Sequence, residues 1–278
     1  MKKIRLHYCI VLFLLLVHAG SQAAITEKVS VPSQKMNKHI PAIVVLPDAV
    51  RNSDHKFPVV YLLHGHSGHY QDWSQNADLG AAAEKYQVII VCPDGSTNSW
   101  YLDSEADPTS QYETFVGKEL MDWIDARYPT VATKQGRAIT GLSMGGHGSL
   151  YLAFRHPENY IAAGSMSGGV DLTYSTVKWE LAQKLGDYEK HPDRWHRNSV
   201  VNLVGQVKGQ QLAILIDCGV DDFFIDINRN LHQKLVQQKI PHDYVERPGG
   251  HSWDYWVRVL EYHLLFFSES FRANHTAR

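Results

Sequence analysis

Residues 141–145 read Gly141-Leu142-Ser143-Met144-Gly145, a Gly-x-Ser-x-Gly motif between a short apolar run and a helical stretch. This setting is typical of a nucleophile elbow, a sharp strand-to-helix turn that presents a serine at its tip. Glycines stand two residues on either side because the tight turn tolerates only minimal side chains there. We expect the following helix to run from about residue 144 to 155 and to stop before Pro157. Its positive N-terminal end would point at Ser143, where negative charge would develop.

Continuous apolar runs lie on both sides of this motif and predict strands that are buried on both faces of a sheet. They occupy residues 58–63, 88–91 and 212–216. Helical patterns separate them, at residues 77–86, 112–127, 227–238 and 253–267. Strands that alternate with helices imply an α/β protein with a mostly parallel sheet covered on both faces. Residues 27–46 alternate as strands do but contain prolines, which predicts antiparallel N-terminal strands at a sheet edge.

The composition is that of an ordinary globular protein. The chain has 278 residues, of which 44% are hydrophobic, and a formal net charge of −2. This near-neutral charge gives no electrostatic footprint for nucleic acid, so we expect no nucleic-acid partner. No repeat, low-complexity tract or linker interrupts residues 24–278, which we take as a single domain. Residues 172–209 have no strand pattern and are interpreted as an excursion from the sheet, of the size of a small cap.

The first residues have the pattern of a signal peptide. A basic start is followed by an apolar stretch at residues 9–17, which is too short to span a bilayer, and by small residues at 21–24. We therefore expect residues 1–23 to be removed and the protein to be exported, periplasmic or secreted, without membrane association after cleavage. Three cysteines are too few for a disulfide scaffold. We expect Cys92 and Cys218 to stay unpaired, because they end strands that the sheet should keep several strands apart.

A serine nucleophile needs a general base, and the base needs an acid to orient it. In an open parallel sheet these groups collect at the carboxyl ends of the strands, in the chain order serine, acid, histidine. The chain supplies Ser143, an acidic cluster after the strand at 212–216, and His251 on a glycine-rich turn. Three acids compete for the second place in that order, Asp217, Asp221 and Asp222. Asp217 is nearest the strand end, and position alone does not choose between the other two.

An oxyanion hole needs two backbone N–H donors. The N–H of Met144, directly after the serine, is one candidate. The other should come from the loop at residues 64–68, which reads His64-Gly65-His66-Ser67-Gly68 and follows a buried strand. Small residues in this loop let the backbone approach a substrate closely.

Four segments together resemble the esterase D family. They read YLLHG (61–65), GLSMGG (141–146), CGVDD (218–222) and GGHSW (249–253). The family includes tributyrin esterases, feruloyl and acetylxylan esterases, S-formylglutathione hydrolases and the antigen 85 mycolyltransferases. The resemblance covers nearly the whole mature chain. It implies an α/β-hydrolase fold and no metal or cofactor.

The resemblance also assigns individual positions. It implies that the acid is the second aspartate of the Val-Asp-Asp step, Asp222, and that the second oxyanion donor is the amide of His66. The segment 98–101 looks family-like as well, which makes Trp100 and Tyr101 candidate substrate-binding residues. Two aromatic residues of the excursion, Trp179 and Trp195, are further candidates to stack on a sugar or a phenolic ring.

These observations predict an exported serine carboxylesterase. Its expected substrates are short-acyl or hydroxycinnamoyl (feruloyl or acetyl) esters, as small molecules or on oligosaccharides and polysaccharides. Export argues against a substrate such as a cytosolic glutathione thioester, and the excursion is too short and too polar for the broad apolar lid of a long-chain lipase. An S-formylglutathione-hydrolase-like thioesterase and an acyltransferase are alternatives on the same fold.

Two alternatives belong to other classes. His64, His66 and His69 form a His-x-His-x-x-His pattern close to that of zinc metallohydrolases. Their pattern usually has aspartate directly before the last histidine, where this chain has Gly68. An exported binding protein that keeps the fold without the activity is the other alternative, and the intact set of serine, acid and histidine argues against it.

Overall fold

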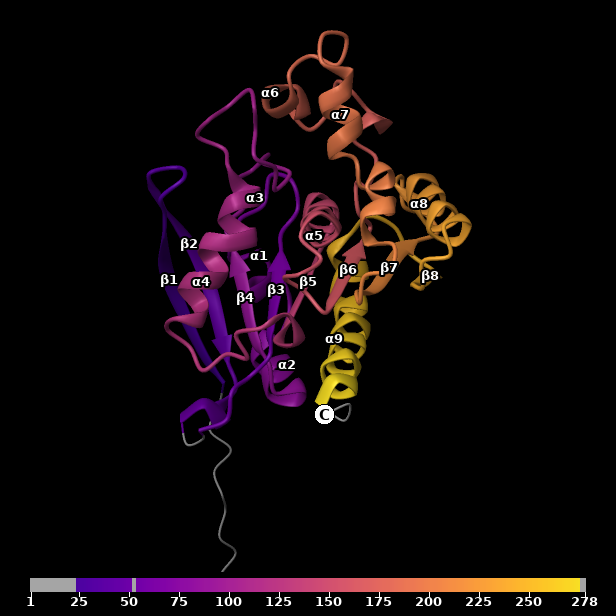
Figure 1. Cartoon of the computed structure of the whole chain (residues 1–278). Coiled ribbons are helices and arrows are strands. Elements are labelled where there is room, and N and C mark those ends of the chain that lie inside the picture. Colours follow the sequence, from indigo (N-terminus) through magenta and orange to yellow (C-terminus); the bar gives the residue numbers. More distant parts are fainter. Residues whose placement is uncertain (1–23, 52–53, 276–278) are drawn as a thin grey trace, which may run out of the picture.

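One eight-stranded sheet organises the part of the chain described by the computed structural model, residues 24–51 and 54–275 (Figure 1). The predicted signal peptide and Cys9 lie outside these residues. The strand order is β1-β2-β4-β3-β5-β6-β7-β8. The strands are β1 (Ile25–Ser33), β2 (Lys38–Leu46), β3 (Val59–Leu63), β4 (Ile89–Pro93), β5 (Arg137–Gly141), β6 (Ala162–Met166), β7 (Ala213–Gly219) and β8 (Asp243–Arg247). Strands β3 to β8 are parallel, whereas β2 is antiparallel to both β1 and β4. The predicted mostly parallel sheet with antiparallel N-terminal edge strands is therefore confirmed.

Helices connect the strands and cover the sheet. They are α1 (Asp72–Asn76), α2 (Leu79–Tyr86), α3 (Tyr112–Thr114), α4 (Leu120–Asp125), α5 (Met144–Arg155), α6 (Leu181–Leu185), α7 (Pro192–Asn198), α8 (Ile225–Gln237) and α9 (Trp253–His275). A π-helical turn at Phe115–Glu119 joins α3 to α4. The last helix continues beyond residue 267, where the sequence pattern ended it. Within the described ranges, no helix combines the length and the apolar character that a membrane span requires.

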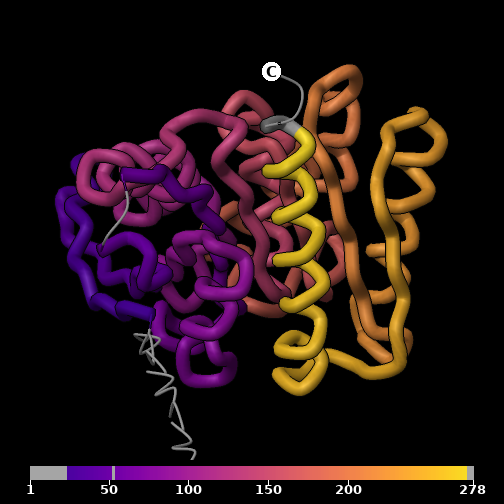
Figure 2. Tube along the Cα trace, turned by 90° about the horizontal axis from the view of Figure 1, so that it is seen from below, coloured from indigo at the N-terminus to yellow at the C-terminus, as the bar shows by residue number. Residues whose placement is uncertain are grey.

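The central strands are buried on both faces because their side chains alternate between two apolar cores. On β3, Val59, Tyr61 and Leu63 belong to the core that also contains residues of α4, α5 and α8. Val60 and Leu62 belong to the other core, beneath α2 and α9. Figure 2 shows α9 lying along its face of the sheet. This covering on both faces explains why the sequence shows continuous apolar runs instead of alternation.

Residues 172–209, the cap segment, contain no strand and fold into α6, α7 and short 3₁₀ turns, as expected from their pattern. The segment lies at the top of the molecule in Figure 1, beyond the carboxyl ends of the parallel strands. It has its own anchor in Trp195, which is fully buried and donates a hydrogen bond from Nε1 to the carbonyl of Gly186. Trp195 is therefore a packing residue of the cap segment and not the stacking platform that the sequence suggested.

Cys92 and Cys218 are both buried and unpaired, as predicted. They lie on β4 and β7, and the strands β3, β5 and β6 separate them in the sheet. Burial raises the pKa of both thiols. A buried thiol with a raised pKa forms little thiolate and is chemically inert, so both cysteines act as small apolar core residues.

Candidate active site

Ser143 lies at the tip of the turn between β5 and α5. Its backbone has φ 54° and ψ −113°, a positive-φ conformation that residues other than glycine rarely adopt. Three backbone hydrogen bonds hold it there. Ser143 N–H donates to the carbonyl of Met166 at 2.9 Å, and the carbonyl of Ser143 accepts from the N–H of His147 at 3.0 Å and of Gly169 at 3.2 Å. Such a conformation costs about 1–3 kcal/mol and persists where the surroundings enforce it, as functional sites often do.

The glycines of the motif are required by the close approach of β3. A Cβ at position 145 would lie 2.5 Å from the carbonyl oxygen of Leu63 and 2.6 Å from that of His64. A Cβ at position 141 would lie 2.7 Å from the same Leu63 oxygen. These atoms belong to backbone that cannot move aside, so the elbow can form only with glycine at both positions.

A chain of hydrogen bonds joins Ser143 to His251 and His251 to Asp222. His251 Nε2 lies 2.9 Å from Ser143 Oγ, and His251 Nδ1 lies 2.9 Å from Asp222 Oδ2. Because a carboxylate only accepts, the proton of the imidazole is assigned to Nδ1, which leaves Nε2 as the acceptor that faces the serine. This arrangement can take a proton from the serine hydroxyl.

The structure brings one of the three candidate acids to His251. Asp222 is buried, and its Oδ1 also accepts a hydrogen bond from the N–H of Phe224 at 2.8 Å. Asp221 is exposed. Asp217 is fully buried but bonded elsewhere: it accepts from Arg247 Nε at 2.8 Å and from the hydroxyl of Tyr255. The geometry therefore agrees with the position that the family resemblance implied.

The two amides that the sequence predicts for the oxyanion hole belong to Met144 and His66. Met144 is the first residue of α5, so its N–H lies in the positive first turn of that helix. His66 lines the same cavity as Ser143, in a loop held by a hydrogen bond from Ser67 N–H to the carbonyl of Thr97 at 2.7 Å. Within residues 24–51 and 54–275, neither the His66 nor the Met144 N–H donates to a backbone carbonyl. This lack of a backbone acceptor is what the oxyanion-hole prediction requires of both groups.

Ser143 and His251 open into a cavity of about 310 Å³. Its lining consists of the residues Gly65, His66, Gly68, Asp72, Leu142, Ser143, Trp179, Phe223, His251, Trp253 and Trp256. One wall is formed by Trp179 from the cap segment and Phe223, whose rings stack at 6.1 Å with an interplanar angle of 16°. The Phe223 ring also lies 4.3 Å from the His251 ring. The cavity is therefore bounded by flat aromatic surfaces close to the serine.

The expected substrate-binding role of Trp100 and Tyr101 is wrong. Trp100 is 2% exposed and Tyr101 is fully buried, so neither side chain can reach a substrate in the cavity. Tyr101 donates its hydroxyl hydrogen to the carbonyl of His64, and Trp100 donates from Nε1 to the carbonyl of Trp179. Both residues support the walls of the site from behind. The sequence interpretation missed three aromatic residues of the cavity lining, Phe223, Trp253 and Trp256. Phe223 directly follows Asp222, and this adjacency was the available signal.

The three histidines of the zinc alternative have separate partners. Buried His64 accepts a hydrogen bond at Nε2 from the N–H of Gly95 at 2.7 Å, and burial lowers its pKa. His66 contacts Glu180, and His69 contacts Asp72. Among the described residues, no three His, Cys, Asp or Glu side chains gather into a group that could hold a metal ion. The structure therefore does not assemble the site that the His-x-His-x-x-His pattern suggested.

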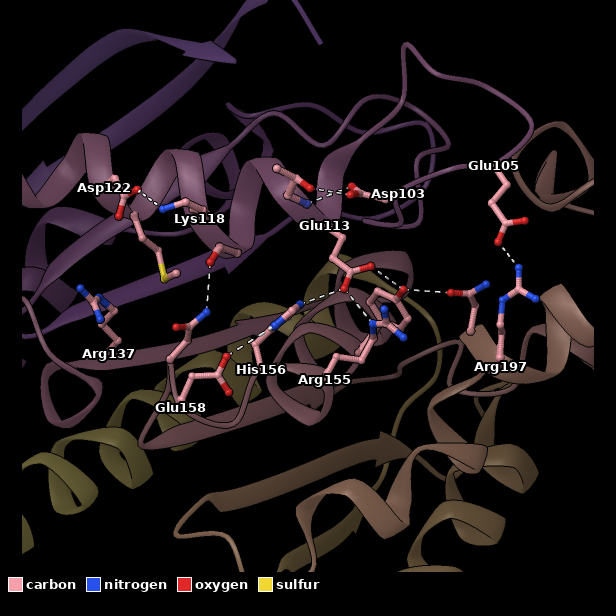
Figure 3. A pocket seen from close by; sticks show the side chains of 16 residues that line it. Asp103, Glu105, Glu113, Lys118, Asp122, Arg137, Arg155, His156, Glu158 and Arg197 are labelled. Carbon is pink, nitrogen blue, oxygen red and sulfur yellow. Dashed lines mark hydrogen bonds and ion pairs between the residues drawn. The ribbon is translucent and has the colours of Figure 1, made fainter. Parts of the chain in front are cut away.

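A larger cavity, of about 630 Å³, lies between the α3–α4 region, α5 and α7 (Figure 3). Its lining is mostly charged, and Glu113 is the centre of its hydrogen bonding. The Glu113 carboxylate accepts from Arg155 Nε at 2.7 Å, His156 Nε2 at 2.8 Å and the Tyr151 hydroxyl at 2.7 Å. Burial alone would raise the pKa of Glu113, but these three donors outweigh it and lower the pKa to about 2. This network ties the C-terminal end of α5 to the chain around α3.

Glu113→Gln should therefore destabilise the protein without removing a group from the Ser143 cavity. A pKa lowered from 4.5 to about 2 corresponds to a stabilisation of about 3 kcal/mol at neutral pH, and the variant should lose about this much in its free energy of unfolding. Because the folded-state pKa is depressed, this stabilisation is present above pH 4.5 and is lost as the pH falls toward 2. Urea unfolding at pH 7 and at pH 3 measures both effects. An equal difference between wild type and variant at the two pH values would contradict the assignment.

The arrangement as a whole, a serine on the turn after β5 and an aspartate and a histidine after β7 and β8, on a mostly parallel sheet, defines the class of α/β hydrolases. A family model described as "Putative esterase" matches residues 33–267. The chain belongs to this esterase family, and it is a carboxylic ester hydrolase.

Individual relatives agree with this membership. The chain is similar to the acetyl esterase of Caldicellulosiruptor saccharolyticus, with 28% identity over 255 residues that cover 82% of this chain and 92% of the relative. Among solved structures, a ferulic acid esterase superposes with a TM-score of 0.77 at 26% identity and covers 89% of this chain and 99% of its own. An S-formylglutathione hydrolase from Staphylococcus aureus shares the fold, with a TM-score of 0.78 at 18% identity, covering 88% of this chain and 99% of its own.

Proposed function

We propose that the protein is an exported serine carboxylesterase that acts through an acyl-enzyme intermediate on Ser143. The hydrogen-bonded chain from Ser143 Oγ through His251 to Asp222 is the observation that carries this proposal. In the first step, Ser143 Oγ attacks the ester carbonyl carbon while His251 Nε2 takes its proton. Asp222 keeps the imidazole in the correct tautomer and stabilises the imidazolium that forms.

The remaining steps use the same groups. The N–H groups of His66 and Met144 stabilise the oxyanion of the tetrahedral intermediate. As the intermediate collapses, the bond to the alcohol oxygen breaks and His251 returns the proton to the leaving alcohol. His251 Nε2 then takes a proton from a water molecule, which attacks the acyl carbonyl carbon of the acyl-enzyme. The bond to Ser143 Oγ breaks, His251 returns the proton to this oxygen, and the carboxylic acid is released. The cycle therefore needs only the ester, one water molecule and these residues.

We propose short-acyl and hydroxycinnamoyl esters as substrates, including those carried by oligosaccharides. The volume of about 310 Å³ suits a small acyl group, and the stacked rings of Trp179 and Phe223 offer a flat surface for a phenolic ring or a sugar. The similarity to an acetyl esterase and to a ferulic acid esterase supports the same two acyl classes. The thioesterase and acyltransferase alternatives share the proposed acyl-enzyme and differ only in the leaving or accepting group.

Export belongs to this proposal and is supported by the sequence of residues 1–23. Expression of the full chain in a bacterium, followed by separation of periplasm, medium and cytoplasm, tests it. N-terminal sequencing of the exported form should find a start after Ala23 or Ala24. Full-length protein confined to the cytoplasm would contradict export.

A substrate series tests the specificity. We expect kcat/KM on nitrophenyl esters to peak between acetyl and butyryl and to fall by octanoyl. Glutathione thioesters and transfer to added alcohols should be slower than hydrolysis of methyl ferulate or of acetylated and feruloylated xylo-oligosaccharides. A peak at long chains would overturn the short-acyl proposal. Activity on free small esters alone would overturn the carbohydrate proposal.

Phe223→Leu should affect hydroxycinnamoyl esters more than acetyl esters, because it removes the aromatic ring and keeps an apolar side chain against His251. An aromatic contact contributes about 0.5–1.5 kcal/mol, so KM for methyl ferulate should rise about 5-fold, with little change for an acetyl ester. Leu265→Ala, an equally exposed apolar residue on α9, is the matched control. An equal change for both substrates in Phe223→Leu would remove the stacking surface from the proposal.

A further inference from the structure

The cap segment contacts the loop of the proposed oxyanion donor through one side-chain pair. Glu180 Oε2 lies 3.2 Å from His66 Nε2, across 114 residues of sequence. The other imidazole nitrogen, Nδ1, lies 3.0 Å from Ser67 Oγ. A neutral imidazole with its proton on Nε2 satisfies both contacts: it donates to the carboxylate and accepts from the serine hydroxyl. The ring of His66 is thus fixed at both nitrogens.

The backbone on both sides of this contact is held in a rare conformation. Trp179 and Glu180 are consecutive residues with φ 56° each, and Ser67 has φ 61°. Non-glycine residues in this region persist where neighbouring contacts over-determine them, and they cluster at functional sites. Here the carbonyl of Trp179 accepts from Trp100 Nε1, and Ser67 N–H donates to Thr97. The side chain of Glu180 is therefore presented to His66 by a strained and well-anchored turn.

We propose that Glu180 is a positioning residue for ester hydrolysis, which holds the imidazole of His66 so that the His66 amide stays aimed at the developing oxyanion. This inference rests on the proposed function, because it assumes that the amide of His66 is an oxyanion donor. The loop contains Gly65 and Gly68, which leave the backbone conformational freedom, and the side chain of His66 restricts that freedom. The cap segment thereby takes part in the chemical step as well as in forming the cavity wall.

This role predicts which kinetic constant changes. The oxyanion carries its full charge only in the transition state, so a misplaced donor lowers kcat and leaves KM nearly unchanged. Removal of one oxyanion donor costs about 10²–10³ in kcat. Glu180→Ala only loosens the donor, and the pair is partly exposed, so we expect kcat to fall about 10-fold. Glu180→Gln keeps an accepting oxygen and should lose less, about 2-fold.

The experiment measures kcat and KM for nitrophenyl acetate in the protein as exported. Glu189→Ala, which removes an exposed carboxylate from the same cap segment, is the matched control and should behave as wild type. His66→Ala keeps the backbone amide and should also lower kcat. The double variant His66→Ala with Glu180→Ala should be no slower than the slower single variant, because both changes break the same contact.

Three outcomes would overturn the inference: a wild-type kcat in Glu180→Ala, an equal loss in Glu189→Ala, or additive losses in the double variant. Thermal unfolding of each variant shows whether it still folds. If Glu180→Ala does not fold, the kcat of Glu180→Gln is compared with that of wild type instead. Ser143→Ala distinguishes this failure from that of the proposed function. An active Ser143→Ala variant refutes the proposed function, whereas an inactive one together with a wild-type Glu180→Ala variant refutes the positioning role alone.

Discussion

Ser143→Ala is expected to lower kcat for ester hydrolysis by a factor of about 10⁴ to 10⁶. The substitution removes the only atom that would form the covalent bond to the acyl group. It should not disturb the turn, because the three backbone hydrogen bonds that hold residue 143 use its N–H and carbonyl groups. Initial rates on nitrophenyl acetate, with thermal unfolding as a check on folding, measure the effect.

A fluorophosphonate probe gives an independent readout, since it should label the wild-type protein and not the variant, with or without EDTA. Ser30→Ala, on the exposed edge strand β1, is the control and should retain full activity and labelling. Substantial hydrolysis by Ser143→Ala would rule out this serine as the nucleophile. Hydrolysis that EDTA abolishes would favour a metal-dependent reaction.

Asp222→Asn is expected to lower kcat by about 10⁴, as a comparable change does in serine proteases. An asparagine at this position can donate from its amide nitrogen to His251 Nδ1. The imidazole proton would then lie on Nε2, which faces Ser143, and this nitrogen could no longer accept the serine proton. The variant should bind substrate with little change in KM, because the carboxylate does not line the cavity.

The neighbouring acid provides a control of the same chemistry. Asp221→Asn makes the same change on an exposed side chain one residue earlier, and its activity should stay within about 2-fold of wild type. The pair of variants therefore tests which aspartate orients His251. If Asp221→Asn is inactive and Asp222→Asn is not, the assignment from the hydrogen-bond geometry is wrong.

The sheet and the position of Ser143 could be predicted because both depend on local sequence. Continuous apolar runs mark strands that are buried on both faces, and the elbow needs glycine at fixed spacing. The choice between Asp221 and Asp222 could not be made from position, because both follow β7 in the same short loop. Burial and the direction of each side chain decide it, and these depend on packing against residues far away in the sequence.

Packing also explains the error at Trp100 and Tyr101. Aromatic residues in a loop have the same sequence pattern whether they line a cavity or fill the space behind it. Here both residues adopt left-handed backbone conformations that turn their side chains into the core. Trp179 lies in front of Trp100 and forms the wall instead, although 79 residues separate them. The export of the chain stays a prediction, because it rests on residues outside those that the structure describes.

The two edge strands of the sheet affect whether copies of this protein aggregate. An unpaired strand edge can act as a template for the strand of another molecule and lead to aggregation. On β1, the exposed residues include Glu27, Lys28 and Pro32, and proline offers no N–H to an incoming strand. On β8, Glu246 binds Arg229 through two hydrogen bonds of 2.8 Å, which places charge along that edge. Hydrogen-bonded strand pairing between molecules is therefore disfavoured at both edges of the sheet.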